Sequence, residues 1–280
     1  MSVTTEGTPA TSKEQIIIEG ATVRLAGDSG DGMQLAGSQL TGTSAQLGND
    51  VATFPDFPAE IRAPRGTLAG VSGFQVHFSS DDIFTPGDAL DALVVMNPAA
   101  LKTNLGDLRK GGILIANADN FEKKDNDMAG YASNPLDSEV LEHTYQLFKV
   151  PMTRITRDAL KDMGMSQKEI DRCKNFFALG LVYWLYGRDL DPTIRFLNEK
   201  FGSKPEIAEA KRKQSHAIGF PLARLVRFGH PPASEETPIA HDRMGALKQP
   251  AICWMGLAQA SFRPGGRCKR SSYPSTISLG

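Results

Sequence analysis

The sequence holds few of the residues that build metal centres, disulfide frameworks or nucleic-acid surfaces. Only 3 of its 280 residues are cysteine, too few for a four-cysteine iron–sulfur cluster, and this count fits a reducing cytoplasm better than a disulfide scaffold. The 5 histidines lack the paired spacing of a metal site. A formal net charge of -1 leaves no basic excess for nucleic acid, and no apolar run is long enough to span a membrane. We therefore expect a cytoplasmic protein that binds neither nucleic acid nor membrane.

The composition is that of an ordinary globular protein, with 40% hydrophobic residues, and the length allows one large or two modest domains. Residues 1–15 are rich in Thr, Ser and Gly and lack the apolar core of a signal peptide, so we expect a flexible leader there. Residues 16–230 carry the periodic patterns of a folded domain. Beyond Asp242 the chain contains no Asp or Glu and clear periodicity fades, which sets residues 231–280 apart.

A glycine-rich turn of sequence GDSGDG, residues 27–32, lies at the centre of the predicted fold. The apolar run 21–26 ahead of it predicts a strand, and apolar residues at helical spacing from Met33 to Leu47 predict a helix that Gly48 ends. Close glycines let the backbone turn sharply and bring its N–H groups near a ligand, and the helix dipole favours an anion at the same place. The candidate ligand-binding residues of the turn are Gly27, Ser29, Gly30 and Gly32.

The turn leaves two interpretations open, an anion cradle and a tight turn whose glycines only allow close packing. Its glycine order is G-x-x-G-x-G, where the dinucleotide fingerprint is G-x-G-x-x-G, and the Lys-Ser or Lys-Thr pair of a Walker A loop does not follow. Asp28 and Asp31 would partly repel a phosphate. The Gly-Asp-Gly within the turn resembles the start of a thiamine diphosphate and magnesium motif, but Asn49 lies too early to supply the required metal ligand.

The second candidate site is a proline-rich run, residues 55–66, which follows a predicted strand at 50–54. Its prolines exclude a helix and a central strand, and so predict a shaped loop. Arg62 and Arg65 lie in this loop, near the C-terminal edge of the strand, where α/β folds place their ligands. They indicate either an anion or partner site or two solvated arginines on a rigid loop, and residue chemistry alone favours the second.

The remaining pattern predicts an α/β fold with an open, mostly parallel, Rossmann-like sheet, helices on both faces and a helical C-terminal part. Alternating or continuously apolar runs predict further strands at residues 67–79, 90–96, 113–116 and 145–150. Helical spacing predicts helices at residues 99–108, 153–163, 167–186, 192–201 and 204–218. The polar segment 117–127 predicts a loop.

The helix predicted at residues 167–186 is the most apolar of these elements, and its aromatic stripe is typical of a protein core. Lys174 and Asn175 enter this helix beside Cys173, and we interpret them as structural. The chain shows no nucleophile or general base that would make it catalytic by itself.

Four segments together resemble the 2-oxoacid:ferredoxin oxidoreductases, and more narrowly subunit alpha of the 2-oxoglutarate type. They are residues 27–34 (GDSGDGMQ), 53–64 (TFPDFPAEIRAP), 73–77 (GFQVH) and 96–98 (MNP). The proline-rich segment is highly specific to this family. The similarity runs from Ala21 to Pro232, the part of the chain that the family calls the gamma domain.

The resemblance implies a subunit of an enzyme that decarboxylates a 2-oxoacid on thiamine diphosphate, passes electrons through an iron–sulfur cluster to ferredoxin and transfers the acyl group to coenzyme A. It implies that thiamine diphosphate, magnesium and the cluster are held largely by a partner, the beta subunit. It also implies that this domain assists assembly and coenzyme A handling, with the turn 27–32 and the Arg62/Arg65 loop matched to that role. On this basis we expect no turnover from this chain alone.

The chain departs from the family pattern after Asp242. In the family, subunit alpha continues into a second domain with a Tyr-Pro-x-Thr-Pro motif, which residues 273–276 (YPST) only echo because Ile277 stands in place of the second proline. We expect residues 231–280 to be a linker and a truncated or frame-shifted start of the thiamine pyrimidine-binding domain.

Two other functions fit the same fold class. The first is a non-catalytic nucleotide- or coenzyme A-binding or scaffold module that docks a partner. The second is a nicotinamide dehydrogenase, which the glycine order disfavours. A nicotinamide dehydrogenase also needs an acidic residue after its second strand to bind the ribose. The nearest candidate, Asp56, is expected inside the proline-rich loop instead.

Overall fold

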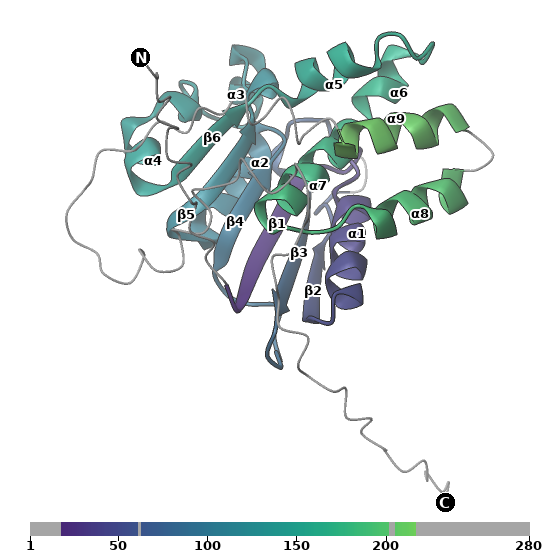
Figure 1. Cartoon of the computed structure of the whole chain (residues 1–280). Helices are drawn as coiled ribbons and strands as arrows, with labels where there is room; N and C mark the ends of the chain where they lie inside the picture. The colour runs from purple at the N-terminus through teal and green to yellow at the C-terminus, as the bar shows by residue number, and fades with distance from the viewer. Residues whose placement is uncertain (1–17, 61–62, 202–204, 217–280) are drawn as a thin grey trace, which may run out of the picture.

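The computed structural model describes residues 18–60, 63–201 and 205–216 (Figure 1). The leader expected at residues 1–15, the candidate site residue Arg62 and the segment 231–280 lie outside the described residues.

The centre of the described chain is a 6-stranded sheet with the order β2-β3-β1-β4-β5-β6. Its strands are β1 (Gly20–Asp28), β2 (Asp50–Asp56), β3 (Val71–Ser79), β4 (Leu90–Val95), β5 (Leu108–Asn117) and β6 (Gln146–Val150). The pairs β1/β4, β4/β5 and β5/β6 are parallel, whereas β3 runs antiparallel to both of its neighbours, β1 and β2. The predicted open, mostly parallel sheet is therefore confirmed, with one reversed strand that the sequence pattern did not reveal.

Helices cover both faces of this sheet (Figure 1). One core joins the strands to α1 (Met33–Gln46), α5 (Met152–Leu160), α7 (Lys174–Leu185) and α8 (Asp191–Phe201). A second core on the other face joins them to α2 (Pro98–Asn104), to residues beside α3 (Lys123–Met128) and to α4 (Glu139–Thr144). The short helix α6 (Gln167–Asp171) and the last described helix, α9 (Pro205–His216), pack beside α5 and α7.

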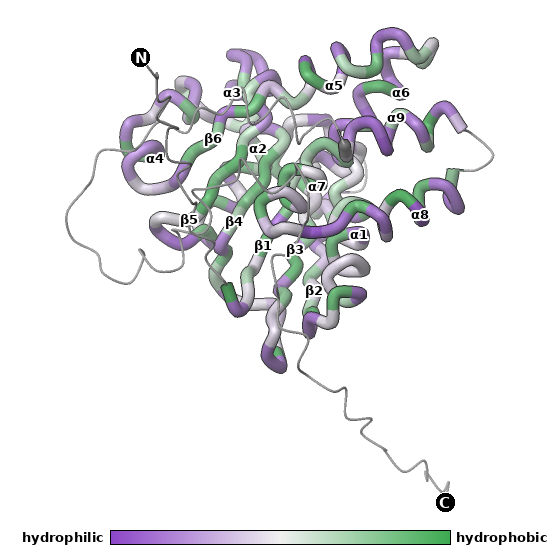
Figure 2. The backbone as a smooth tube through the Cα atoms, in the orientation of Figure 1, coloured by the Kyte–Doolittle hydropathy of each residue, from purple (hydrophilic) through white to green (hydrophobic). Residues whose placement is uncertain are grey.

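The central strands owe their positions to their apolar residues. Along β4, Ala92 and Val94 point into the first core, while Leu93 and Val95 point into the second, and all four are fully buried. A strand that is buried on both sides needs a continuous apolar run, and Figure 2 shows hydrophobic residues concentrated along these inner strands. The aromatic stripe of α7 lies in the first core, as predicted, with Phe176 and Phe177 buried.

The strand β2 is longer than predicted, because it continues through Pro55 to Asp56. Proline is excluded from central strands because it donates no hydrogen bond, but β2 pairs only with β3 and forms the edge of the sheet. The expected loop therefore begins after Asp56. Asp56 itself ends a second strand. A ribose-binding acid follows a second strand that lies next to the first, whereas β3 separates β2 from β1 here.

Four other features differ from the prediction. The segment expected as a loop at residues 117–127 contains most of α3, and α4 was not predicted. The helix predicted at residues 167–186 is divided into α6 and α7, where Arg172 and Cys173 interrupt it. The strand β5 begins at Leu108 and passes through Gly111, whose φ of 75° accommodates an irregular register against β4.

We predict that Gly37→Ala destabilises the protein by about 1–3 kcal/mol, because helix α1 packs too closely on β3 to admit a methyl group. A Cβ at this position would lie 2.2 Å from Cδ1 of Phe74. Gly42→Ala in the same helix is the matched control, since a Cβ there meets nothing within 4 Å, and it should stabilise the helix by about 0.5–1 kcal/mol. Urea unfolding measures both, and equal effects of the two substitutions would contradict this packing.

Candidate functional site

The glycine-rich turn lies at the C-terminal edge of the parallel strands, between the end of β1 and the start of α1. The neighbouring strand β4 ends beside it, where the Met96 N–H donates to the Ala26 carbonyl over 3.0 Å. The helices that follow these two strands, α1 and α2, belong to the cores on opposite faces of the sheet. This arrangement is a topological switch point, the place where open α/β sheets bind ligands.

Both aspartates of the turn fold back into the protein. The Asp28 N–H donates to Oδ2 of Asp31 over 3.1 Å, and the Asp31 N–H donates to the Asp28 carbonyl over 2.9 Å. The Asp28 carboxylate also accepts the Gly66 N–H over 3.1 Å. Asp28 and Asp31 are 5% and 4% exposed. Their carboxylates therefore shape the turn from inside and do not line its outer surface, where the sequence suggested they would repel a phosphate.

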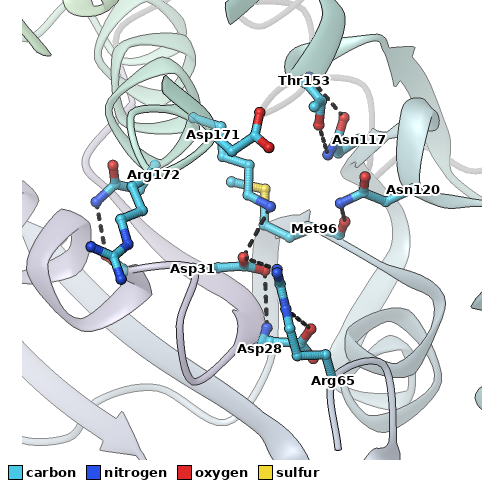
Figure 3. A network of polar contacts seen from close by, with 12 residues as sticks. Asp28, Asp31, Arg65, Met96, Asn117, Asn120, Thr153, Asp171 and Arg172 are labelled. Carbon is cyan, nitrogen blue, oxygen red and sulfur yellow. Dashed lines mark hydrogen bonds and ion pairs between the residues drawn. The ribbon is translucent and has the colours of Figure 1, made fainter. Parts of the chain in front are cut away.

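Two cations balance the two carboxylates. Nε of Arg65 lies 3.5 Å from Oδ2 of Asp28, and its Nη2 donates to Oδ1 of Asp31 over 3.2 Å (Figure 3). The second cation is Lys174, the first residue of α7, whose Nζ lies 2.9 Å from the same Oδ1. The Arg65 side chain is 75% exposed, whereas that of Lys174 is 6% exposed. The sequence indicates a structural role for Lys174, and the structure places this residue directly at the candidate site.

The glycines of the turn serve two different purposes. At Gly27 a Cβ would lie 2.9 Å from Oδ2 of Asp31, so the missing side chain lets that carboxylate fold inward. Gly32 has a φ of +75°, and a Cβ there would lie 2.5 Å from Nδ2 of Asn175. Ser29 and Gly30 form the exposed tip, and a Cβ at Gly30 would meet nothing within 4 Å. The packing interpretation thus applies to Gly27 and Gly32, and Ser29 and Gly30 remain accessible to a ligand.

Further polar residues line the same edge of the sheet (Figure 3). Nδ2 of Asn120 donates to the Met96 carbonyl over 3.0 Å, and Nδ2 of Asn117, at the end of β5, donates to Oγ1 of Thr153 over 3.0 Å. Asn97 caps α2 by accepting the Ala100 N–H over 2.8 Å. Asn97 lies two residues after β4, Asn117 ends β5 and Asn120 follows it, and this placement of Asn at the ends of buried strands is the signal that could have indicated the site.

The junction of α6 and α7 connects the turn to α9. Nδ2 of Asn175 donates to the Gly32 carbonyl over 3.3 Å, and Nζ of Lys211 donates to Oδ1 of Asn175 over 3.3 Å. Burial lowers the pKa of Lys211. Burial also raises the pKa of the Cys173 thiol, which disfavours the thiolate that a nucleophile requires.

Neither a metal site nor a membrane-spanning helix occurs within residues 18–60, 63–201 and 205–216. No group of three or more His, Cys, Asp or Glu residues in this part of the chain could hold a metal ion. None of the helices described there is long and apolar enough to cross a bilayer.

Comparison with known proteins places the chain among ferredoxin-linked oxidoreductases. Residues 22–214 match the family described as pyruvate ferredoxin/flavodoxin oxidoreductase. The chain is 53% identical over 193 residues to the 2-oxoglutarate oxidoreductase subunit KorA of Mycobacterium tuberculosis. That match covers 69% of this chain and 29% of KorA. It is similar, with a TM-score of 0.53 and 25% identity, to the structure of 2-oxoglutarate:ferredoxin oxidoreductase from Magnetococcus marinus with 2-oxoglutarate, coenzyme A and succinyl-CoA bound. That match covers 71% of this chain and 31% of the solved one. The chain thus spans less than a third of the length of either relative.

We predict that Gly32→Ala destabilises the protein by about 1–3 kcal/mol, because the left-handed backbone and the contact with Asn175 both exclude a side chain. Gly30→Ala is the control at the open tip of the same turn, and it should change the free energy of unfolding by less than about 0.5 kcal/mol. Thermal and urea unfolding of both variants check this. A Gly32→Ala protein as stable as the wild type would contradict the described turn.

Proposed function

From the premise that the chain belongs to the pyruvate ferredoxin/flavodoxin oxidoreductase family, we propose that it supplies the gamma domain of a 2-oxoglutarate:ferredoxin oxidoreductase. Membership rests on the family match over residues 22–214, and the choice of 2-oxoglutarate rests on the 53% identity to KorA. The complete enzyme would convert a 2-oxoacid to acyl-CoA and pass the electrons to ferredoxin.

This chain would act together with a beta subunit. Thiamine diphosphate with magnesium would supply the decarboxylation chemistry, and an iron–sulfur cluster the electron transfer. The described residues do not fit either group, because they contain no cluster of three or more potential metal ligands and one cysteine, Cys173, which is buried. We therefore assign no step through those groups to this part of the chain. Its own contribution would be to bind and orient coenzyme A.

The observation that carries this assignment is an exposed arginine held at the switch point of the sheet. Arg65 is 75% exposed, yet its guanidinium is fixed by Asp28 and Asp31 next to the open tip at Ser29 and Gly30. A planar guanidinium matches the oxygens of a phosphate, and a fixed one loses little freedom on binding. Coenzyme A carries phosphates that such a group can bind.

The start of α1 adds a second source of positive potential. Gly32 precedes the helix without a side-chain cap, so the first backbone N–H groups of α1 are not occupied by a capping side chain. The positive end of the dipole of this 14-residue helix lies at the turn. Backbone amides and Arg65 together would hold the anionic end of coenzyme A while its thiol reaches the reaction centre of the partner subunit.

A second candidate is a scaffold module that uses the same fold only for assembly. It is favoured by the internal pairing of the site, since both carboxylates and Lys174 are satisfied within the protein. Such a module would associate with a partner and would bind no coenzyme A at the turn.

We predict that Arg65→Ala weakens binding of coenzyme A by roughly tenfold or more, because one charged hydrogen bond to a phosphate is lost. Arg195→Ala is the matched control. Arg195 lies on α8 and contacts Gln46 at the far end of α1, so its removal should leave the affinity unchanged. Calorimetric titration of the full chain with coenzyme A measures both. An affinity that survives Arg65→Ala would exclude Arg65 from the site.

We further predict that turnover requires a thiamine-binding beta subunit. The full chain alone should reduce no dye, whereas the mixture should reduce a redox dye when 2-oxoglutarate and coenzyme A are both present. A stable mixed complex without such activity would favour the scaffold module. Turnover by the chain alone would contradict the proposal that the beta subunit holds the groups needed for the reaction.

A further inference from the structure

Two cations share a single oxygen atom at the turn, and they differ in how firmly each is held. Nζ of Lys174 lies 2.9 Å from Oδ1 of Asp31, and Nη2 of Arg65 lies 3.2 Å from the same atom. The side chains of Asp31 and Lys174 are 3% and 6% exposed, so this pair lies inside the fold. Arg65 reaches the carboxylate from the surface, with 75% of its side chain exposed.

We propose that Lys174 is a positioning residue that keeps Arg65 available for an anionic ligand. The inference rests on the proposed function, because the ligand is the phosphate end of coenzyme A. A buried carboxylate cannot be left without a cation, since its desolvation must be offset by a charged partner. With Lys174 present, Asp31 keeps such a partner when Nη2 of Arg65 releases it.

Lys174 is the partner that stays. It opens α7, and the next residue, Asn175, is tied to the Gly32 carbonyl and to Lys211. Arg65, in contrast, approaches from the surface, and its Nε lies 3.5 Å from Oδ2 of the second carboxylate, Asp28. Nη2 of Arg65 can therefore exchange its hydrogen bond to Asp31 for one to a phosphate oxygen while Nε stays beside Asp28, and Lys174 continues to neutralise Asp31.

Removing Lys174 makes Asp31 depend on Arg65 alone. With Met at position 174, the buried Asp31 carboxylate has Arg65 as its only cation among the described residues. Arg65 is then held on Asp31 and competes poorly for a ligand. Removing the Asp31 charge as well, in Asp31→Asn/Lys174→Met, eliminates the buried charge at position 31, so that Nη2 of Arg65 is released again while Nε keeps its 3.5 Å contact with Asp28. A residue that only stabilised the fold would not show this reversal.

The test uses the full 280-residue chain and two independent measurements. The first is the rate at which phenylglyoxal modifies Arg65, followed by peptide mass spectrometry, which reports how freely the guanidinium leaves Asp31 without any ligand. The second is the affinity for coenzyme A by calorimetry. Lys161→Met, at an exposed lysine at the end of α5, is the control that removes the same charge elsewhere.

We expect Lys174→Met to slow the modification of Arg65 and to weaken coenzyme A binding, each by roughly tenfold. The double variant should return both values to within about twofold of the wild type, and Lys161→Met should change neither. If Lys174→Met fails to fold, Lys174→Gln replaces it in the test. Gln is neutral, although shorter than Lys, and retains a hydrogen-bond donor, so we expect the same slower modification and weaker binding.

Each other outcome has a defined meaning. If Arg65 in the neutral variants at position 174 reacts as fast as in the wild type, or if the double variant does not restore the rate, the role of Lys174 is overturned. If the modification rates follow the expected pattern but the wild type does not bind coenzyme A, the control of Arg65 by Lys174 stands and the coenzyme A site at the turn is overturned.

Discussion

A carboxylate inside a folded protein has to be neutralised, and the geometry of the β1–α1 turn follows from how Asp31 meets this requirement. Lys174 approaches it from the interior and Arg65 from the surface, while the Asp28 N–H donates to its second oxygen. Gly27 provides the space for the inward carboxylate, and Asp28 ties the turn to Gly66. Removing one partner of a buried ion pair of this kind destabilises a protein by about 3–5 kcal/mol. The charges therefore hold the turn in one conformation.

The sheet determines where that turn lies. Continuous apolar burial on both sides holds β4 beside β1, and the helices after these strands diverge to opposite faces. The resulting edge collects the turn, the loop with Arg65 and the start of α7, although these segments are far apart in the sequence. The solved 2-oxoglutarate:ferredoxin oxidoreductase to which the chain is similar has coenzyme A bound, and the proposed role places this anionic carrier at this edge of the sheet.

Local sequence patterns predicted most of the framework, because they depend on neighbouring residues. The helix after the turn was expected to end at Leu47 and ends at Gln46, and the central strand β4 was recognised by its apolar run. Two kinds of feature depended on tertiary structure. Pro55 lies within β2 because that strand is at the edge of the sheet, and Gly32 and Asn175 meet although they are 143 residues apart. Composition and spacing contain no information on such a contact, so Lys174 and Asn175 were interpreted as structural.

The most direct test of the central claim is backbone hydrogen exchange of the full chain with and without coenzyme A. If the carrier binds where the buried charges fix the turn, exchange should slow at residues 28–34 and 63–70. Slowed exchange at residues 80–89 instead, which follow the end of β3 at the opposite edge of the sheet, would contradict the site. So would a pattern that coenzyme A leaves unchanged.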